Sequence, residues 1–250
     1  MTSWAYLDHP GPIAFAHRGG AGDWPENSMR AFANAVSLGY RYVETDVHRT
    51  ADGAVVAFHD DRLDRLTDHQ GPIADLDWDT VRTARTGGEP IPLLEDLLGT
   101  WPDLRVNIDA KHDAVVRPLL AVVDRMGAHD RVCVASFSDR RLVGVRRLSR
   151  GKICTAAGPR TIARLRMAGY GVPTGTVAAA CTQVPLNYGR VRVVDARFVA
   201  AARKRGVPVH VWTIDDPAEM DRLLDLGVDG IMTDRPAVLK EVLQRRGQWV

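Results

Sequence analysis

The sequence predicts an α/β fold, specifically a (β/α)8 barrel. Three observations support this prediction: eight short apolar segments resemble strands, amphipathic segments separate most of them, and the chain has 250 residues. Regular alternation on this scale is typical of a closed parallel barrel, and the length suits one such domain. We therefore expect a single domain over residues 1–250.

The expected strands are short apolar runs bounded by turn-forming or charged residues. They cover 13–16, 42–47, 104–109, 131–135, 152–156, 176–184, 207–212 and 228–232. The expected helices show apolar residues at helical spacing and cover 28–39, 93–98, 115–125, 140–148, 161–167, 196–205 and 218–226, with a last one after Pro236. The pattern is least regular in the sixth strand, where Pro173, Pro185 and the run 178–180 interrupt it.

Composition excludes several classes of protein. The chain is 45% hydrophobic and 26% charged, as in an ordinary globular protein, and its net charge of +2 is too small to predict nucleic-acid binding. No apolar run is long enough to span a bilayer, and the first ten residues lack the basic and apolar regions of a secretion signal. The expected location is therefore the cytoplasm.

The three cysteines are Cys133, Cys154 and Cys181. They are odd in number and far apart, and no Cys-x-x-Cys pair exists, so neither a zinc ribbon nor a redox motif is indicated. Each lies in or beside an apolar run, which predicts buried free thiols.

The second strand and the hairpin after it carry several ionisable groups. Alternation places Glu44 and Asp46 on the same face of the strand, where they repel each other unless a cation lies between them. The pair Asp52-Gly53 predicts a hairpin turn, so that the returning strand brings His59 near both carboxylates. Residues 60–90 are polar and turn-rich, and we expect them to lie over the site without forming a core element.

Further polar side chains fall at the carboxyl ends of strands, where barrel enzymes carry their chemistry. His17 and Arg18 follow the first strand, Asp109 and Lys111 end the third, and Trp212 closes the seventh. Ser136, Gln183, Asp215 and Asp234 are expected at the same rim. Each of these residues, taken alone, has a structural alternative. Asp109 could cap a helix, Lys111 could be a solvated surface charge, and Trp212 could fill the core. Their common location favours a functional site.

The carboxylates at this rim predict a metal site. Glu44, Asp46 and Asp109 offer the oxygen ligands that a hard cation such as Mg²⁺ or Ca²⁺ prefers. Together with such a cation, Arg18 and Lys111 would hold a phosphate and neutralise the charge that builds up during displacement.

Two histidines complete the expected site. With an ordinary pKa of about 6.5, His17 and His59 suit the roles of general acid and general base near neutral pH. The other histidines are expected to be structural or exposed: His9, His48, His69, His112, His129 and His210. Of these, His48 lies two positions after Asp46 and fits the same face of the strand. The whole pattern predicts a metal-assisted, phosphodiester-cleaving site.

Several strings in the sequence resemble the glycerophosphodiester phosphodiesterase family. They are His17-Arg18-Gly19, Pro25-Glu26-Asn27-Ser28, Glu44-Thr45-Asp46-Val47, Asp52-Gly53, His59-Asp60, Val211-Trp212-Thr213 and the run 230–236. The resemblance covers residues 13–236, and it depends on all of these strings occurring in this order. It implies a TIM barrel with a small insertion after strand 2, which corresponds here to residues 47–90.

The resemblance also implies an activity and roles for individual residues. Glycerophosphodiesters would be hydrolysed to sn-glycerol 3-phosphate and an alcohol, with attack by the free glycerol hydroxyl and a cyclic phosphate intermediate. The implied acid/base pair is His17 and His59; the implied ligands of a divalent cation (Mg²⁺, Ca²⁺ or Mn²⁺) are Glu44, Asp46 and Asp109; and the implied substrate contacts are Arg18, Lys111 and Trp212.

Two positions depart from the family pattern. Asp109 stands where the family has Glu, and the shorter side chain would reach the cation through water or shift its position. Ile214-Asp215-Asp216 stands where the family has Asn, which adds negative charge near the expected phosphate site unless the loop turns outward.

Two alternative functions remain compatible with the sequence. A lysophospholipase D-like or phospholipase D-like enzyme would use the same scaffold and would need an apolar opening near residues 60–90, where Leu63, Leu66, Ile73, Leu76 and Trp78 occur. A non-catalytic module that binds glycerophosphodiesters would keep the pocket without needing the two histidines.

Overall fold

The computed structural model describes residues 4–250 and shows eight parallel strands in one curved sheet. They are β1 (Ile13–Ala16), β2 (Tyr42–Arg49), β6 (Arg105–Ala110), β7 (Val132–Ala135), β8 (Cys154–Thr155), β9 (Thr182–Pro185), β12 (Val209–Trp212) and β13 (Gly230–Thr233). Their order is β8-β7-β6-β2-β1-β13-β12-β9, and a parallel bridge between Ala156 and Cys181 joins the two ends. The predicted (β/α)8 barrel is therefore confirmed.

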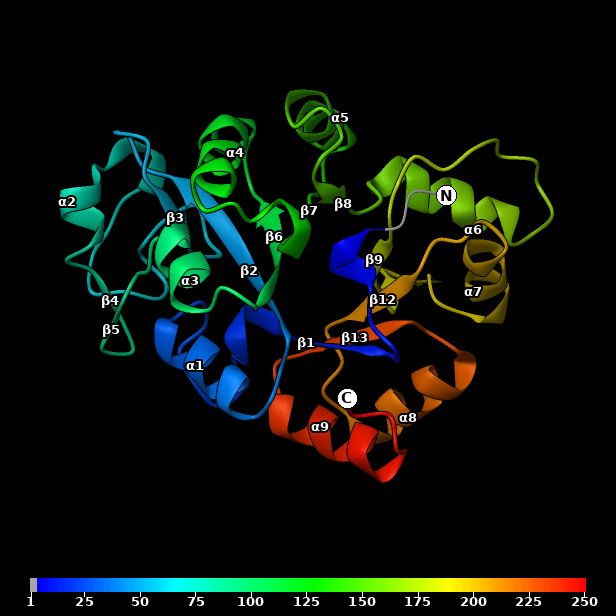
Figure 1. The fold of residues 1–250 in the computed structure, drawn as a ribbon. Helices are drawn as coiled ribbons and strands as arrows, with labels where there is room; N and C mark the ends of the chain where they lie inside the picture. The colour runs from blue at the N-terminus through cyan, green and yellow to red at the C-terminus, as the bar shows by residue number, and fades with distance from the viewer. Residues whose placement is uncertain (1–3) are drawn as a thin grey trace.

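Helices surround the sheet on its outer side (Figure 1). They are α1 (Met29–Ser37), α3 (Leu94–Thr100), α4 (Val116–Arg125), α5 (Asp139–Leu148), α6 (Pro159–Ala168), α7 (Ala196–Arg203), α8 (Pro217–Leu226) and α9 (Pro236–Arg245). Their apolar faces bury residues such as Leu97, Leu119 and Leu223 against the strands, and this layer forms the main core. Ser28 caps α1, since its side chain accepts a hydrogen bond from the amide of Ala31.

The segment between β2 and α3 is an insertion with its own small core. It contains β3 (Val55–Ala57), η3 (Ile73–Asp75), α2 (Trp78–Val81), β4 (Arg85–Thr86) and β5 (Glu89–Pro90). Leu63, Ile73 and Val81 are fully buried in a cluster that also contains Val56. The expectation that residues 60–90 add no core element is therefore wrong. Their apolar side chains, although separated by acids, fold onto one another and onto the β2–β3 hairpin.

The sixth barrel strand is shorter than predicted. The sequence indicated a strand over 176–184, whereas β9 begins at Thr182 and its neighbour β8 has only two residues. Residues 173–179 are irregular: Pro173 has no amide hydrogen for a strand ladder, and Gly175 adopts a φ of +69°, outside the strand region. Pro185 is tolerated because it is the last residue of the strand.

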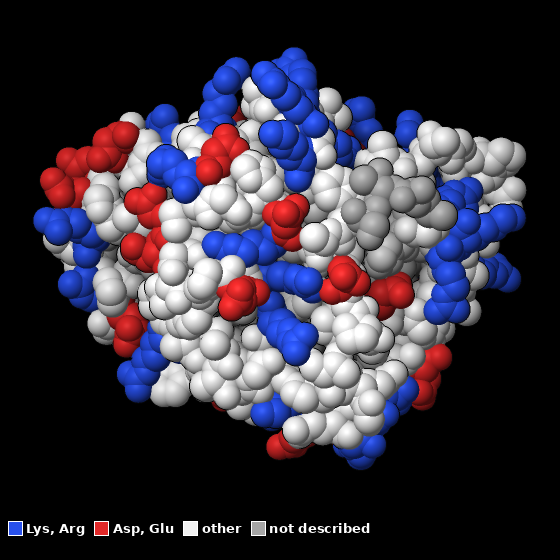
Figure 2. Space-filling view, viewed as in Figure 1, with Lys and Arg blue, Asp and Glu red and all other residues white. Residues whose placement is uncertain are grey.

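The amino ends of the strands are covered by η1 (Ala5–Leu7), which buries Tyr6 against Phe15 and Tyr42 inside the barrel. Figure 2 shows the molecule from the same side as Figure 1: acidic and basic side chains are interspersed, with basic ones gathered over α5. Among the described residues, no helix is both long and apolar enough to cross a bilayer.

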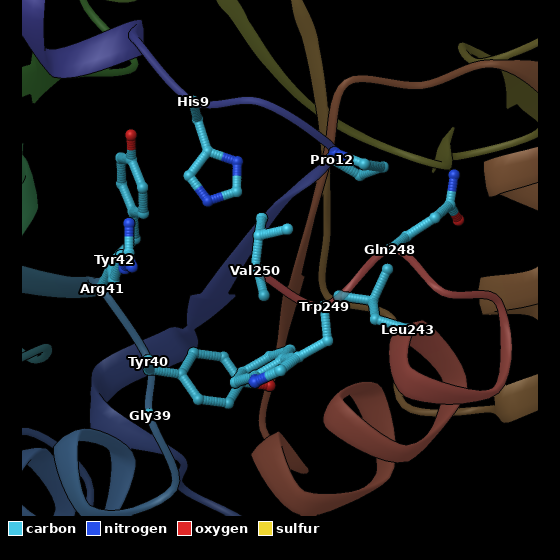
Figure 3. A pocket seen from close by; sticks show the side chains of 11 residues that line it. His9, Pro12, Gly39, Tyr40, Arg41, Tyr42, Leu243, Gln248, Trp249 and Val250 are labelled. Carbon is cyan, nitrogen blue, oxygen red and sulfur yellow. The ribbon is translucent and has the colours of Figure 1, made fainter.

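A small hollow lies near the amino ends of β1 and β2 (Figure 3). Trp249 packs edge-on against Tyr40 there, with 5.1 Å between the ring centroids, and His9 and Arg41 contribute to the lining. Its free volume of about 10 Å³ has room for little more than one water molecule. This hollow is therefore too small for a phosphodiester, and it lies at the opposite end of the strands from the rim predicted to be catalytic.

The main core predicts the effect of a cavity in α4. Leu119→Ala should lower the free energy of unfolding by about 2–5 kcal/mol, because Leu119 is fully buried between the helix and the sheet. Val143→Ala on α5, where the side chain is 58% exposed, is the control and should change stability by less than about 0.5 kcal/mol. Urea unfolding of both variants checks this, and equal losses would contradict the assignment of the core.

Candidate active site

The first histidine is fixed by a carboxylate from the opposite end of the chain. His17 follows β1, and its Nδ1 lies 2.7 Å from Oδ1 of Asp234, which follows β13. The two side chains meet because β1 and β13 are parallel neighbours. With Nδ1 held in this way, Nε2 of His17 points towards Glu44, whose Oε2 is 3.7 Å away.

Backbone geometry lets the loop after β1 pack closely. Gly19 and Gly20 have φ angles of +84° and +105°, and a Cβ on Gly19 would lie 2.8 Å from Ala31. The same turn aims the amide of Arg18 at Oε2 of Glu44, at 3.0 Å. The glycines that follow His17 therefore bring the imidazole and a backbone donor to the same buried carboxylate.

The predicted acid cluster forms on neighbouring strands. Glu44 and Asp46 lie on β2, and Asp46 is the register partner of Asp109 on β6. All three are at least 93% buried. Lys111 bridges two of them, with Nζ 2.6 Å from Asp46 Oδ1 and 2.9 Å from Asp109 Oδ2. Arg18 places Nε 3.3 Å from the other oxygen of Asp46.

Burial and charge set the proton affinity of these groups. Burial, and then the negative charge of Asp46, raises the pKa of Glu44 to about 7. Burial opposes ionisation of Asp46 as well, but Lys111 and Arg18 outweigh it and lower its pKa. Burial raises the pKa of Asp109. Two cations thus compensate only part of the charge of three carboxylates, and the site has an excess of negative charge.

The same competition acts on the first histidine. Burial disfavours the charged imidazole of His17, but Glu44 and the hydrogen bond to Asp234 outweigh it and raise its pKa.

The second histidine is held in the same manner as the first. His59 follows β3, and its Nδ1 lies 2.7 Å from Oδ1 of Asp60. Arg65 holds Asp60 through two contacts of 2.6 and 2.8 Å and lies 3.5 Å from Glu26. Glu26 in turn accepts a hydrogen bond of 3.0 Å from Arg18. A chain of ion pairs therefore links the support of His59 to the acid cluster.

The hairpin brings His59 back to β2, as predicted. The amide of Phe58 donates to the carbonyl of Asp46 at 3.0 Å, and β3 pairs with β2 in antiparallel register. His48 is buried, and its Nε2 lies 3.0 Å from the carbonyl oxygen of His59. Burial lowers the pKa of His48 to about 4. It is therefore neutral near pH 7 and supports the backbone that carries His59.

Trp212 ends β12 at the same rim. Its ring packs edge-on against Phe137, which follows β7, with 5.8 Å between centroids. Phe137 is 67% exposed, so the two rings form an apolar surface at the carboxyl ends of the strands. Ser136 and Gln183, also expected at the rim, bond to protein groups: Ser136 to the carbonyl of Ala110, and Gln183 to Asn107.

The acids that depart from the family pattern have structural partners. Asp215 accepts hydrogen bonds of 2.8 Å from Thr233 Oγ1 and from the amide of Asp234. Asp216 caps α8 by accepting from the amides of Ala218 and Glu219. These carboxylates hold the turn that presents Asp234, so their charges do not require a role in binding.

The donor set suits a hard cation, although the side chains are not arranged around one. Asp109 Oδ1 is buried without a hydrogen-bond partner, and the site carries excess negative charge. Within residues 4–250, however, no three His, Cys, Asp or Glu side chains stand in a metal-binding arrangement. Lys111 and Arg18 pair with the carboxylates, so a bound cation would compete with these two side chains for the same oxygen atoms.

The sequence indicated no supporting role for several of these residues, although it placed Asp234 at the rim. Asp60 and Asp234 anchor the histidines, Glu26 and Arg65 link the anchors, and Asn27 donates to Asp46 at 3.2 Å. Asp60 and Asp234 could have been found from the sequence, because both occur in the strings that resemble the family. Arg65 lies outside these strings and left no signal.

Comparison with known proteins agrees with this geometry. Residues 17–238 match the profile of the "Glycerophosphoryl diester phosphodiesterase family". The chain belongs to this family. It is therefore an enzyme of the phosphoric diester hydrolase class, as the sequence predicted.

Two relatives match almost end to end. "Probable glycerophosphodiester phosphodiesterase 2" of Mycobacterium tuberculosis is 42% identical over 98% of this chain and 95% of its own length. The "Glycerophosphodiester phosphodiesterase" of Caldanaerobacter subterraneus is 30% identical over 94% of this chain and 99% of its own.

Solved structures share the fold of the enzyme. The "Putative glycerophosphoryl diester phosphodiesterase" of Silicibacter pomeroyi has a TM-score of 0.83 and 23% identity, covering 99% of this chain and 100% of that one. A phosphodiesterase of Oleispira antarctica, solved with the product sn-glycerol-3-phosphate, has a TM-score of 0.80 and 22% identity, covering 93% and 97%.

The anchoring of His17 generates a test. Asp234→Asn keeps the size of the side chain but removes the charge that orients and supports the imidazole, so kcat on a glycerophosphodiester should fall about 100-fold or more with little change in KM. Asp103→Asn, at an exposed position, is the matched control and should leave kcat unchanged. Steady-state kinetics decide, and a full rate in Asp234→Asn would show that this carboxylate has no such role.

Proposed function

We propose that the enzyme hydrolyses glycerophosphodiesters to sn-glycerol 3-phosphate and an alcohol. The observation that carries the proposal is the placement of two imidazoles, each held at Nδ1 by a carboxylate at 2.7 Å, beside the buried acids of β2. His17 adjoins Glu44, and His59 is close enough to Asp46 to influence its charge. The names of the relatives support the same substrate class.

His17 and His59 would share the proton transfers. One imidazole takes the proton of the glycerol hydroxyl as its oxygen attacks phosphorus, and the other donates a proton to the oxygen of the departing alcohol. The roles reverse when water opens the cyclic phosphate: one ring takes a proton from water, the other returns one to the glycerol oxygen, and both regain their starting state. Anchoring at Nδ1 leaves Nε2 of each ring for this chemistry.

Glu44, Asp46 and Asp109 would hold a divalent cation, Mg²⁺, Ca²⁺ or Mn²⁺. Oxygen donors, the unpartnered Oδ1 of Asp109 and the excess negative charge support this assignment. When bound, the cation would neutralise charge on the phosphate. Arg18 and Lys111, already at the cluster, would contact the phosphate oxygens.

Trp212 would line the side of the pocket that receives the glycerol carbons. Its ring ends β12 at the catalytic rim and is extended by the exposed ring of Phe137. Apolar faces of this kind bury carbon atoms while the polar groups across the rim hold the phosphate.

The lysophospholipase alternative loses its main support. The apolar residues that would have formed a lipid-sized opening pack into the core of the insertion: Leu63 and Ile73 are fully buried, and Leu66, Leu76 and Trp78 pack against that cluster. The non-catalytic alternative is disfavoured because both histidines are present and anchored.

A substrate panel tests the proposal. Glycerophosphodiesters with different alcohols should release sn-glycerol 3-phosphate, whereas a diester with no hydroxyl next to the phosphoester should not react. Chelator should silence the enzyme, and Mg²⁺, Ca²⁺ or Mn²⁺ should restore it. Enzymatic assay of glycerol 3-phosphate measures both effects. Activity that persists in excess chelator would remove the cation from the proposal, and cleavage confined to lysophospholipids would replace the substrate.

The histidines provide a second test. His17→Ala and His59→Ala should each lower kcat by about 10²–10⁴-fold, because each removes a group that moves a proton. His129→Ala is the control, since this ring pairs with Asp124 outside the site and its removal should leave kcat unchanged. Circular dichroism checks that the variants are folded. A nearly normal rate in either catalytic variant would refute the proton-transfer roles.

A further inference from the structure

Three thiols meet inside the barrel, away from the proposed catalytic rim. Cys133 on β7 is the register partner of Cys154 on β8, and Cys181 forms the bridge that joins β8 to the segment leading into β9. All three are free and fully buried. The sulfur atoms of Cys133 and Cys181 lie 4.0 Å apart, although 48 positions separate them in the sequence.

A buried imidazole without partners adjoins these thiols. His210 on β12 is fully buried, and neither of its ring nitrogens has a hydrogen-bond partner. Room for the ring exists because position 230 is glycine, where a Cβ would lie 2.9 Å from His210 Cδ2. The hydroxyl of Tyr6, which packs in the same interior cluster as the three thiols, is also buried and unpartnered. Buried polar groups in this state are costly unless they meet a ligand.

We propose that Cys133, Cys154, Cys181 and His210 bind a soft divalent cation of the zinc class. Zn²⁺ takes four ligands of this kind, with sulfur at about 2.3 Å in a tetrahedron, which separates two sulfurs by about 3.8 Å. The observed separation of 4.0 Å is close to that value. Carboxylates and waters, the ligands of harder cations, are not among the donors.

Binding changes the protonation of these ligands. All three thiols lose their protons to solvent as they bind, because the thiolate is the form that ligates a metal, while the imidazole binds neutral. The complex therefore carries one net negative charge, and its formation releases three protons.

Binding requires a local adjustment of side chains. Within the described residues, no three of these donors stand in a metal-binding arrangement. The strands fix the Cα and Cβ atoms, so rotation about the Cα–Cβ bonds of the cysteines is the change that gathers the sulfurs. The ligands come from β7, β8, β12 and the segment before β9, and the cation would therefore link strands at the seam held by the Ala156–Cys181 bridge.

Cadmium titration of the full-length protein tests the proposal. The chain is stripped of metal under reducing conditions and titrated with Cd²⁺ in excess Mg²⁺, which occupies the carboxylate site. We expect one Cd²⁺ per chain, sulfur-to-cadmium charge-transfer absorption, and displacement of Cd²⁺ by Zn²⁺. Cys133→Ala and Cys181→Ala should each weaken binding at least tenfold. Met232→Leu, which changes another sulfur-bearing side chain in the same interior cluster, should leave it unchanged.

The wild-type chain provides a measurement that does not depend on the variants folding. The cadmium NMR chemical shift separates sulfur from oxygen ligands, and a sulfur-ligated signal is expected. Absence of charge-transfer absorption, a shift that indicates only oxygen ligands, or Cd²⁺ affinity unchanged in both folded cysteine variants would overturn the proposal. None of these readouts depends on phosphodiesterase activity, so a failure here leaves the proposed function intact.

Discussion

Three carboxylates buried at one place are the constraint that organises the catalytic rim. Glu44, Asp46 and Asp109 are separated from bulk water, so each needs a cation or a hydrogen-bond donor nearby. The structure supplies Lys111, Arg18 and backbone donors from the loop after β1. Two cations face three acids, and burial, followed by the negative charge of Asp46, raises the pKa of Glu44. The proposed cation would add positive charge to this cluster.

The same constraint explains where the histidines lie. His17 approaches the cluster from the end of β1, and His59 from the hairpin that returns along β2. Each ring has its own carboxylate at Nδ1, from Asp234 and Asp60 respectively. Paired anchors of this kind fix the ring orientation and the tautomer, which the proposed exchange of acid and base roles requires.

Features that depend on neighbouring residues were predictable from the sequence. The alternation that places Glu44 and Asp46 together, the Asp52-Gly53 hairpin and the cap at Ser28 all follow from local rules. Contacts that form only when the barrel closes were not predictable from the sequence. Asp234 meets His17 across 217 positions, and no local pattern indicates that pairing. The length of the sixth strand was not predicted because it depends on the short neighbouring strand β8. The core of the insertion was not predicted because its apolar residues have no regular spacing in the sequence.

The three cysteines show the same limit. Their spacing excludes a local metal motif, yet parallel strands place Cys133, Cys154 and Cys181 in one region of the interior. A spacing rule detects ligands only when they come from one short segment, whereas a barrel can gather donors from strands far apart in sequence.

The insertion that carries His59 has a hydrophobic core separate from that of the barrel. His17 belongs to the barrel, whereas His59 follows β3, which pairs with β2 and leads into the insertion, so the proposed proton donor and acceptor lie on different segments. The ion-pair chain from Arg65 through Glu26 to Arg18 connects these segments at the rim, in addition to the hydrogen bonds that Phe58 and His59 make with β2. Turnover would then be sensitive to ionic strength through the spacing of the two rings, even where substrate affinity is unaffected.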